Sequence, residues 1–201
     1  MKYPITGVIL AGGNNTRLPG KNKALIKVGG EPIIYKIYNI YKDLFDEIII
    51  VTNEPALFIE IGLFTVTDIF NVRSSLTGIH SGLFYSSNKN VFFSACDTPF
   101  LKKILVETIL EKIEKNIDVV IPETSAGREP LCAVYSKNCL KPIEMQLLNN
   151  DFKIQNFFKN LRIKKINEDI IKKVDPEMLS FLNINTQDDL ERALQILPKT
   201  I

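Results

Sequence analysis

The sequence predicts an α/β fold of three layers, in which helices cover both faces of a mainly parallel central sheet. Short apolar runs alternate along the chain with longer amphipathic segments, as in PIIYKIYNIYKDL and the EIIIVT that comes after it. This alternation is typical of βαβ units. The EIIIVT run also lacks a polar face, as expected for a strand that helices cover on both sides.

The first half of the chain supplies the clearest elements. Strands are expected where apolar or β-branched residues run together, namely at 5–11, 47–52, 91–95 and, more weakly, 64–67. Helices are expected where apolar residues recur at helical spacing, namely at 32–44, 55–61, 77–87 and 101–116.

The second half is richer in helix. Strands are expected at 118–121 and 131–135, on either side of the polar loop ETSAGRE, and at RIKKI (162–166). Helices are expected at 139–149, 154–159 and 187–197. Thr186 begins the last helix, because its hydroxyl can cap free amides and the following Asp188 and Asp189 suit the helix dipole.

The composition is that of an ordinary globular protein, and we expect one domain spanning 1–201. Of the 201 residues, 45% are hydrophobic and 24% charged, enough for one substantial core. The net charge of +2 gives no global field for nucleic acid, and no apolar run is long enough to span a membrane. Three cysteines without C-x-x-C spacing favour reduced thiols in a cytoplasmic protein.

Polar or glycine residues directly follow four expected strands: Gly12-Gly13, Asn53, Asp68 and Asp97. In parallel α/β sheets, ligands bind beyond the carboxyl ends of the strands. We therefore expect these residues to meet at one edge of the sheet.

The first of these loops, LAGGNNTRLPGKNKAL, combines glycines with cations. The glycines let a ligand approach the main chain, whose amides can cradle phosphate oxygens. Arg17, Lys21 and Lys23 add charge that suits phosphate. The loop matches neither the P-loop nor the dinucleotide fingerprint, so a plain turn with surface cations is a competing interpretation.

Asp97 follows the apolar run VFFSAC. A carboxylate at this strand end could simply cap the next helix. Facing a phosphate loop, it is also well placed to hold Mg²⁺, which prefers one or two carboxylates together with phosphate and water oxygens.

Several motifs, in this order, resemble the molybdenum cofactor guanylyltransferases of the nucleotidyltransferase superfamily. They are LAGG followed by Arg17 and Lys23, VTN, the isolated Asp68, CDTPFL, EPLCAVY and FLNINTQDDL. The resemblance covers nearly the whole chain and implies a Rossmann-like nucleotidyltransferase fold. It also implies transfer of GMP from GTP to the terminal phosphate of molybdenum-bound molybdopterin, with molybdoenzymes or cofactor-delivery proteins as partners.

The resemblance assigns roles position by position. Nucleotide-binding positions are Leu10, Ala11, Gly12, Lys23, Asn53, Asp68 and Asp97. Catalytic positions are Arg17, Lys23 and Asp97, and Asp97 is also the Mg²⁺ ligand. Asn183 and Asn185 match asparagines near the second substrate.

The implied chemistry needs no strong general base, because a phosphate monoester with a second pKa of about 6 is largely ionised near neutral pH. That suits a chain whose single histidine is His80, which we expect to be a packing or surface residue. Catalysis then rests on positioning and electrostatics.

The chain departs from the family pattern in two loops. The usual R-M-G reads Arg17-Leu18-Pro19-Gly20, and the usual G-P-L-A-G reads SSLTG at 74–78. Only Leu76 and Gly78 of the second pattern remain, so we expect guanine preference to be retained but looser.

Other residues have structural explanations that compete with these roles. Asn53 could cap a helix, Asp68 could close a turn, and Asn183 with Asn185 could form the turn before the last helix. Cys96 is expected to be a buried filler. Arg128-Glu129 could meet the pterin or be solvated.

Two other functions compete with this one. A cytidylyltransferase, or an enzyme acting on a sugar or polyol phosphate, is the nearest, although such cytidylyl enzymes commonly read LAAG where this chain reads LAGG. A non-catalytic GTP-binding adaptor would bind GTP without releasing pyrophosphate.

Overall fold

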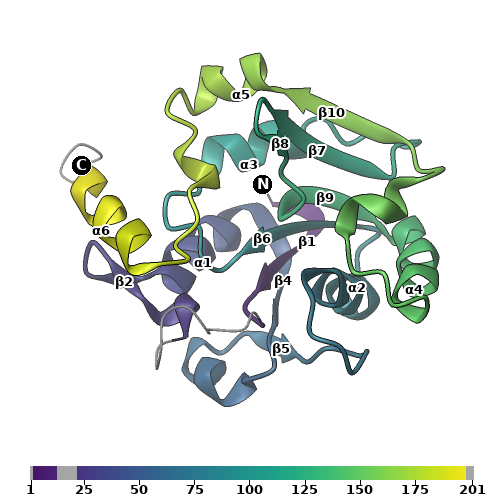
Figure 1. Cartoon of the computed structure of the whole chain (residues 1–201), viewed down its shortest axis with the longest axis horizontal. Helices are drawn as coiled ribbons and strands as arrows, with labels where there is room; N and C mark the ends of the chain where they lie inside the picture. The colour runs from purple at the N-terminus through teal and green to yellow at the C-terminus, as the bar shows by residue number, and fades with distance from the viewer. Residues whose placement is uncertain (1, 13–21, 198–201) are drawn as a thin grey trace.

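The computed structural model describes residues 2–12 and 22–197, and in this part of the chain one eight-stranded sheet runs through the molecule (Figure 1). Seven strands lie in the order β10-β7-β9-β6-β1-β4-β5, and β8 pairs with β7. The strands are β1 (Tyr3–Leu10), β4 (Phe45–Val51), β5 (Phe64–Val66), β6 (Asn90–Ala95), β7 (Val119–Thr124), β8 (Gly127–Arg128), β9 (Cys132–Ser136) and β10 (Ile163–Asn167).

Most neighbouring strands are parallel, which confirms the predicted sheet. β1 is parallel to both β4 and β6, β4 is parallel to β5, and β10 is parallel to β7. β9 is antiparallel to both of its neighbours, β6 and β7. The carboxyl ends of β1, β4, β5 and β6 therefore share one edge of the sheet. Because the sheet takes strands from both halves of the chain, a single domain remains the prediction.

Helices cover both faces of the sheet. The helices are α1 (Ile33–Leu44), α2 (Ser75–Tyr85), α3 (Lys103–Leu110), α4 (Leu140–Leu148), α5 (Glu168–Val174) and α6 (Gln187–Ile196). One buried cluster joins α1, α3, α5 and α6 to Ile9 of β1, and a second joins α2 and α4 to Val8 of the same strand. Since side chains alternate along a strand, the two clusters lie on opposite faces, giving the three predicted layers.

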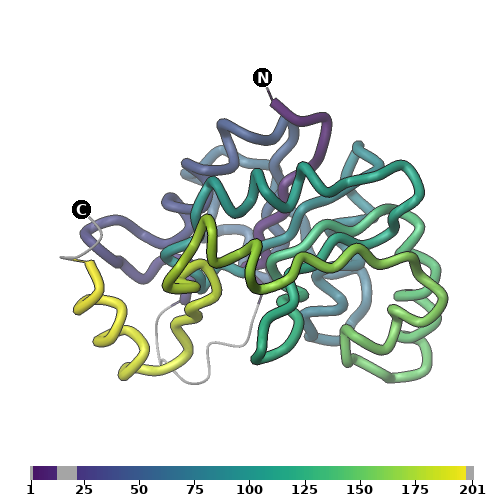
Figure 2. Tube along the Cα trace, turned by 90° about the horizontal axis from the view of Figure 1, so that it is seen from above, coloured from purple at the N-terminus to yellow at the C-terminus, as the bar shows by residue number. Residues whose placement is uncertain are grey.

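A small hairpin of β2 (Lys27–Val28) and β3 (Glu31–Pro32) was not expected. Its turn is Gly29-Gly30, with φ of 67° and 84°, which suits the two-residue turn that glycine favours. The Gly-Gly pair is a signal from which the hairpin could have been predicted. Figures 1 and 2 both place α6 beside this hairpin.

Several expected boundaries were wrong. The helix expected at 101–116 ends at Leu110, where Lys112 N bonds to Ile109 O and Ile113 N to Leu110 O, tightening the chain into turns. This lets Ile113 and Ile117 pack on the core that α3 covers. The segments Pro55–Ile61 and Ile154–Phe158 form 3-10 helices. The short helix α5 was missed because seven residues carry too little periodicity.

Asp118, just before β7, binds the start of the edge strand β10 through hydrogen bonds. Its buried carboxylate accepts hydrogen bonds from the backbone N of Arg162 at 3.0 Å, from Nε of Arg162 at 3.1 Å and from Nδ2 of Asn138 at 2.8 Å. These bonds lower the pKa of Asp118 to about 2, and the hydrogen bonds from the Arg162 side chain contribute most.

The variant Asp118→Asn is expected to lower the free energy of unfolding by about 1–3 kcal/mol at pH 7, because charge-assisted hydrogen bonds are lost. A lowered folded-state pKa stabilises the fold above the unfolded pKa, so the gap between wild type and variant should narrow as the pH falls from about 4 toward 2. Urea unfolding at pH 7 and pH 3 measures both effects.

Glu114→Gln is the matched control, since Glu114 forms an exposed ion pair with Lys164 at 2.9 Å. It should change the unfolding free energy by less than about 0.5 kcal/mol. Equal destabilisation by the two variants at pH 7 would contradict the role given to Asp118.

Candidate functional site

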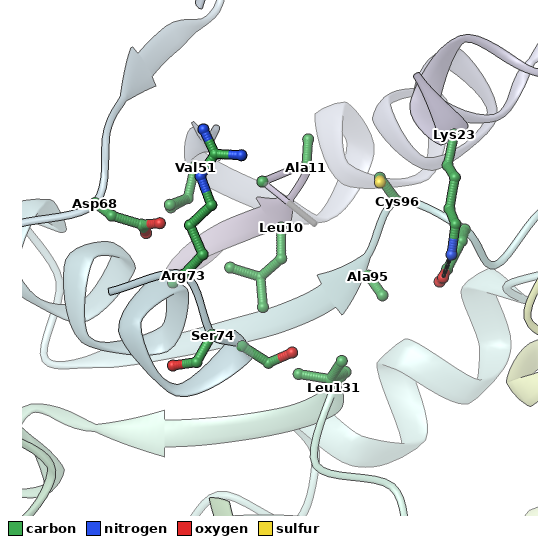
Figure 3. Close-up of a pocket in the computed structure, with 14 residues that line it drawn as sticks. Leu10, Ala11, Lys23, Val51, Asp68, Arg73, Ser74, Ala95, Cys96 and Leu131 are labelled. Carbon is green, nitrogen blue, oxygen red and sulfur yellow. Dashed lines mark ion pairs between the residues drawn. The ribbon is translucent and has the colours of Figure 1, made fainter. Parts of the chain in front are cut away.

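A pocket opens at the edge where β1, β4, β5 and β6 end (Figure 3). Its lining residues are Leu10, Ala11, Gly12, Lys23, Val51, Asp68, Arg73, Ser74, Ser75, Gly78, Ala95, Cys96, Asp97 and Leu131. Leu10, Val51 and Ala95 give it an apolar floor between charged groups.

Hydrogen bonds beyond the strand ends hold the pocket segments in place. Ala11 N bonds to Val51 O at 2.8 Å, Thr52 N to Val66 O at 2.9 Å and Cys96 N to Leu10 O at 3.0 Å. The structure thus brings together Gly12, Asp68 and Asp97, as expected from the parallel sheet. Asn53 joins them, because its Nδ2 donates to Asp68 Oδ2 at 2.8 Å.

Part of the predicted phosphate loop, including Gly13, Arg17 and Lys21, lies outside the described residues. The roles given to these residues stay predictions. Lys23, at the far end of the loop, is described and begins a short 3-10 helix, Lys23–Leu25. Asn22 positions it, accepting a hydrogen bond from Ala24 N at 3.1 Å and donating to Glu54 Oε2 at 2.8 Å. Sequence reasoning overlooked Asn22, although asparagine is a favoured cap.

Asp97 and Lys23 form the charged centre of the site. Lys23 Nζ lies 3.5 Å from Asp97 Oδ2, and both side chains are only 16% exposed. Burial raises the pKa of Asp97, and the Lys23 charge partly offsets this shift. The other carboxylate oxygen, Oδ1, is buried and has no hydrogen-bond partner among the described residues. A buried, unpaired carboxylate oxygen at a pocket wall fits the single-carboxylate coordination of a hard divalent cation.

Among residues 2–12 and 22–197, no group of three or more histidine, cysteine, aspartate or glutamate side chains is arranged to hold a metal ion. Mg²⁺ in phosphate chemistry is commonly held by one or two carboxylates together with substrate oxygens and water, a set to which a single aspartate such as Asp97 can contribute.

Asn185 reaches the same centre from the other end of the chain. Its Oδ1 accepts a hydrogen bond from Lys23 Nζ at 2.6 Å, and the backbone N of Ile184 bonds to Asp97 O at 2.9 Å. The predicted cap at Thr186 is confirmed, as a capping box with Asp189. Asn183, by contrast, is exposed and does not line the pocket, so the structure separates the two asparagines that the sequence pairs.

His80 has the packing role expected for it, whereas Arg128 and Glu129 are packed and not simply solvated. His80 is 2% exposed, lies within 3.1 Å of Glu144 Oε1 and packs edge-on against Phe70. Arg128 pairs with Glu123 at 3.1 Å and lies over the Phe158 ring. Glu129 is half-buried, and burial raises its pKa. None of these residues lines the pocket.

Arg73 and Ser74 line the pocket and were missed. Ser74 caps α2, accepting from Thr77 N at 3.1 Å, and a serine three residues before a threonine at a helix start is a visible signal. Arg73 carries no pattern of its own. Only the fold shows that it stands at the pocket rim.

Comparison with known proteins agrees with this geometry. Residues 7–165 match the family described as the MobA-like NTP transferase domain. The molybdenum cofactor guanylyltransferase of Desulfosudis oleivorans is 43% identical over 189 residues, covering 94% of each chain. The probable molybdenum cofactor guanylyltransferase of Natranaerobius thermophilus is 36% identical over 203 residues, covering 98% of each chain.

A solved structure has the same fold. The crystal structure of molybdopterin-guanine dinucleotide biosynthesis protein A from Archaeoglobus fulgidus superposes with a TM-score of 0.85 at 26% identity, covering 98% of this chain and 100% of that one. None of the described helices is both long and apolar enough to cross a membrane.

Cys96 lines the pocket beside Asp97 but is not expected to react. Burial, aided by the Asp97 charge, raises the pKa of the Cys96 thiol to about 12, and burial also raises the pKa of Cys132 and of Cys139.

We expect no thiol of the native protein to react with a thiol-specific reagent at pH 8, and all three to react in urea. Colorimetric counting of thiols tests this. Fast labelling of Cys96 in the native protein would contradict it.

Proposed function

The chain belongs to the MobA-like NTP transferases, the family of molybdenum cofactor guanylyltransferases, and we propose that its pocket performs that family's reaction. GMP passes from GTP to the terminal phosphate of molybdenum-bound molybdopterin, and pyrophosphate leaves. The observation that carries this proposal is the half-buried Asp97 carboxylate with Lys23 at 3.5 Å, at the edge of the sheet where Gly12 lies.

The bond changes are those of an in-line displacement. An ionised phosphate oxygen of molybdopterin attacks the α-phosphorus of GTP, and the bond from that phosphorus to the bridging oxygen breaks. Pyrophosphate leaves with the electron pair. Because the attacking oxygen already carries its charge near neutral pH, the chain has to position two phosphates and offset their negative charge.

Lys23 is positioned to offset that charge. Its ammonium group is fixed between Asp97 Oδ2 and Asn185 Oδ1, so it needs little reorganisation to reach a phosphate oxygen at the pocket. Arg17 is proposed to act beside it on the leaving group. The main chain of Leu10, Ala11 and Gly12 lines the same side of the pocket and is proposed to bind the nucleotide.

Asp97 is proposed as the ligand of the Mg²⁺ ion. The buried and unpaired Oδ1 supports this role. When bound, the ion would polarise the α-phosphate and neutralise charge as it develops. Oδ2 stays with Lys23, which keeps the carboxylate oriented.

The two substrates are proposed to approach from different sides of Asp97. Asn53 and Asp68, joined by their hydrogen bond of 2.8 Å, would bind the guanosine end of GTP. Asn185, held at Lys23, and the exposed Asn183 would meet the molybdopterin. Delivery of the product to molybdoenzymes in the cytoplasm is part of the same proposal, and the three buried free thiols suit a reducing compartment.

A two-substrate assay tests the function. Purified protein with Mg²⁺ should release pyrophosphate from GTP only when molybdenum-bound molybdopterin is present. A chelator should stop the release and added Mg²⁺ should restore it. Turnover with CTP alone would assign the chain to the cytidylyl enzymes, and GTP binding without release would make it an adaptor.

Asp97→Asn is expected to lower kcat about 100- to 1000-fold, because the metal ion that would stabilise charge on the reacting phosphate loses its carboxylate ligand. Removing one electrostatic stabiliser of the transition state commonly costs this much. The variant is nearly isosteric, so it should remain folded and still bind GTP. Stopped assays of pyrophosphate release, with GTP binding measured separately, give both values.

Asp43→Asn is the matched control, because Asp43 lies on the surface and pairs with Lys103 at 2.9 Å. Its kcat should equal that of the wild type. If Asp97→Asn retained full turnover, the proposed metal ligand would be wrong.

A further inference from the structure

The pocket has a second charged end, where the proposed function gives Asp68 a role in binding guanosine but gives Arg73 none. Arg73 and Asp68 line this end, whereas Lys23 and Asp97 line the other. Figure 3 shows the guanidinium group of Arg73 beside Val51, on the same side of the pocket as Asp68, with Lys23 on the opposite side beyond Cys96. A nucleotide whose phosphates lie at Lys23 would extend its base toward Arg73.

The backbone that carries Arg73 is anchored on both sides. Ser74, the next residue, caps α2 and contacts Thr77 Oγ1 at 2.8 Å. At the start of the same loop, Ile69 N donates to Ser81 Oγ at 3.0 Å. Both anchors belong to α2, so the loop that carries Arg73 is fastened to one rigid element at the pocket rim.

Asp68 stands opposite as an oriented acceptor. Asn53 Nδ2 donates to its Oδ2 at 2.8 Å. Burial raises the pKa of Asp68, and the nearby charge of Arg73 acts against this shift. The carboxylate and the guanidinium therefore influence each other across the end of the pocket.

The floor between the two charged ends suits a flat ring. Leu10, Val51 and Gly78 contribute to it. A methyl group added at Gly78 would lie 3.1 Å from Leu10 Cδ2, so the glycine lets α2 pack closely against Leu10 at this floor. A base lying on this floor would have Asp68 and Arg73 at one edge.

Guanine matches that pair of charges and adenine does not. Guanine presents O6 and N7 as acceptors next to the N1–H and 2-amino donors, whereas adenine carries an amino donor in place of O6. Arginine binds O6 and N7 of guanine in a bidentate manner, and this is the commonest specific contact to that base.

We propose that Arg73 is a specificity-determining residue that donates hydrogen bonds to O6 and N7 of the guanine base, beside the donors that face Asp68. The proposal rests on the proposed function, since it takes GTP as the nucleotide. It changes one expectation drawn from the sequence. The SSLTG segment loses the usual G-P pair, but the arginine just before it supplies a contact that keeps guanine selectivity strict.

Nucleotide binding by the full chain tests the proposal without the second substrate. Calorimetry would compare wild type, Arg73→Met and Arg73→Lys with four ligands: GTP, ITP, ATP and 2-aminopurine riboside triphosphate. ITP keeps O6 but lacks the 2-amino group, and the 2-aminopurine nucleotide keeps the amino group but lacks O6. Arg73→Met should weaken GTP and ITP about 10- to 100-fold, and the two ligands without O6 less than about 3-fold.

Arg73→Lys should recover only part of the loss, because lysine has no planar fork for two acceptors. Arg192→Met is the matched control, since Arg192 lies on exposed α6 away from the pocket lining, and it should bind all four ligands as the wild type does. An equal loss for all four nucleotides in Arg73→Met would place Arg73 on the ribose or phosphates and overturn the proposal. If Arg73→Met kept the wild-type preference for GTP over ATP, the proposal would also be overturned.

The binding experiment can overturn the role of Arg73 without overturning the proposed reaction, and the assay of the reaction can fail without affecting the role of Arg73. A wild type that prefers GTP through Arg73 but makes no dinucleotide would overturn the reaction and leave the base contact standing. A wild type that transfers GMP while Arg73→Met keeps its selectivity would overturn only the inference about Arg73.

Discussion

The Asp97 carboxylate and the Lys23 ammonium are the contact around which the site is assembled. Burial disfavours the ionised form of Asp97 and raises its pKa, whereas the positive charge of Lys23, 3.5 Å away, favours the ionised form. Lys23 also binds Asn185, so this one contact joins the start of the chain, the end of β6 and the start of α6. Each partner is held by its own local structure: Lys23 by the Asn22 cap, Asp97 by the end of a central strand, Asn185 by the Thr186 capping box.

The direction of the strands gives the pocket its remaining walls. Since β1, β4, β5 and β6 are parallel, four loops from distant parts of the sequence emerge at one edge. β9 runs the other way and delivers Leu131 to that edge from its amino end. The result is a pocket with an apolar floor and charged residues at both ends. In the proposed function, phosphate chemistry takes place at one end and the base binds at the other.

The strands, the acid at the pocket and the cap of the last helix could be predicted from the sequence, because each depends on a local pattern. The strand at 91–95 and the acid after it lie in one uninterrupted motif, and Thr186 with Asp189 is a local signal that needs no tertiary structure. The contact of Lys23 with Asn185 spans 162 positions, and no local pattern encodes it. Arg73 was missed because nothing near it distinguishes it from a surface arginine. α3 ends early because Ile113 and Ile117 pack back on the core, a tertiary effect that overrides helical spacing.

The central claim is that this pocket joins a guanine nucleotide to a pterin phosphate, and the identity of the product tests it most directly. The protein would be given molybdenum-bound molybdopterin, Mg²⁺ and an equal mixture of GTP, ATP, CTP and UTP, and the dinucleotide formed would be identified by mass. The guanine dinucleotide should be the dominant product. A cytosine or mixed product, or none while the pterin substrate is intact, would contradict it.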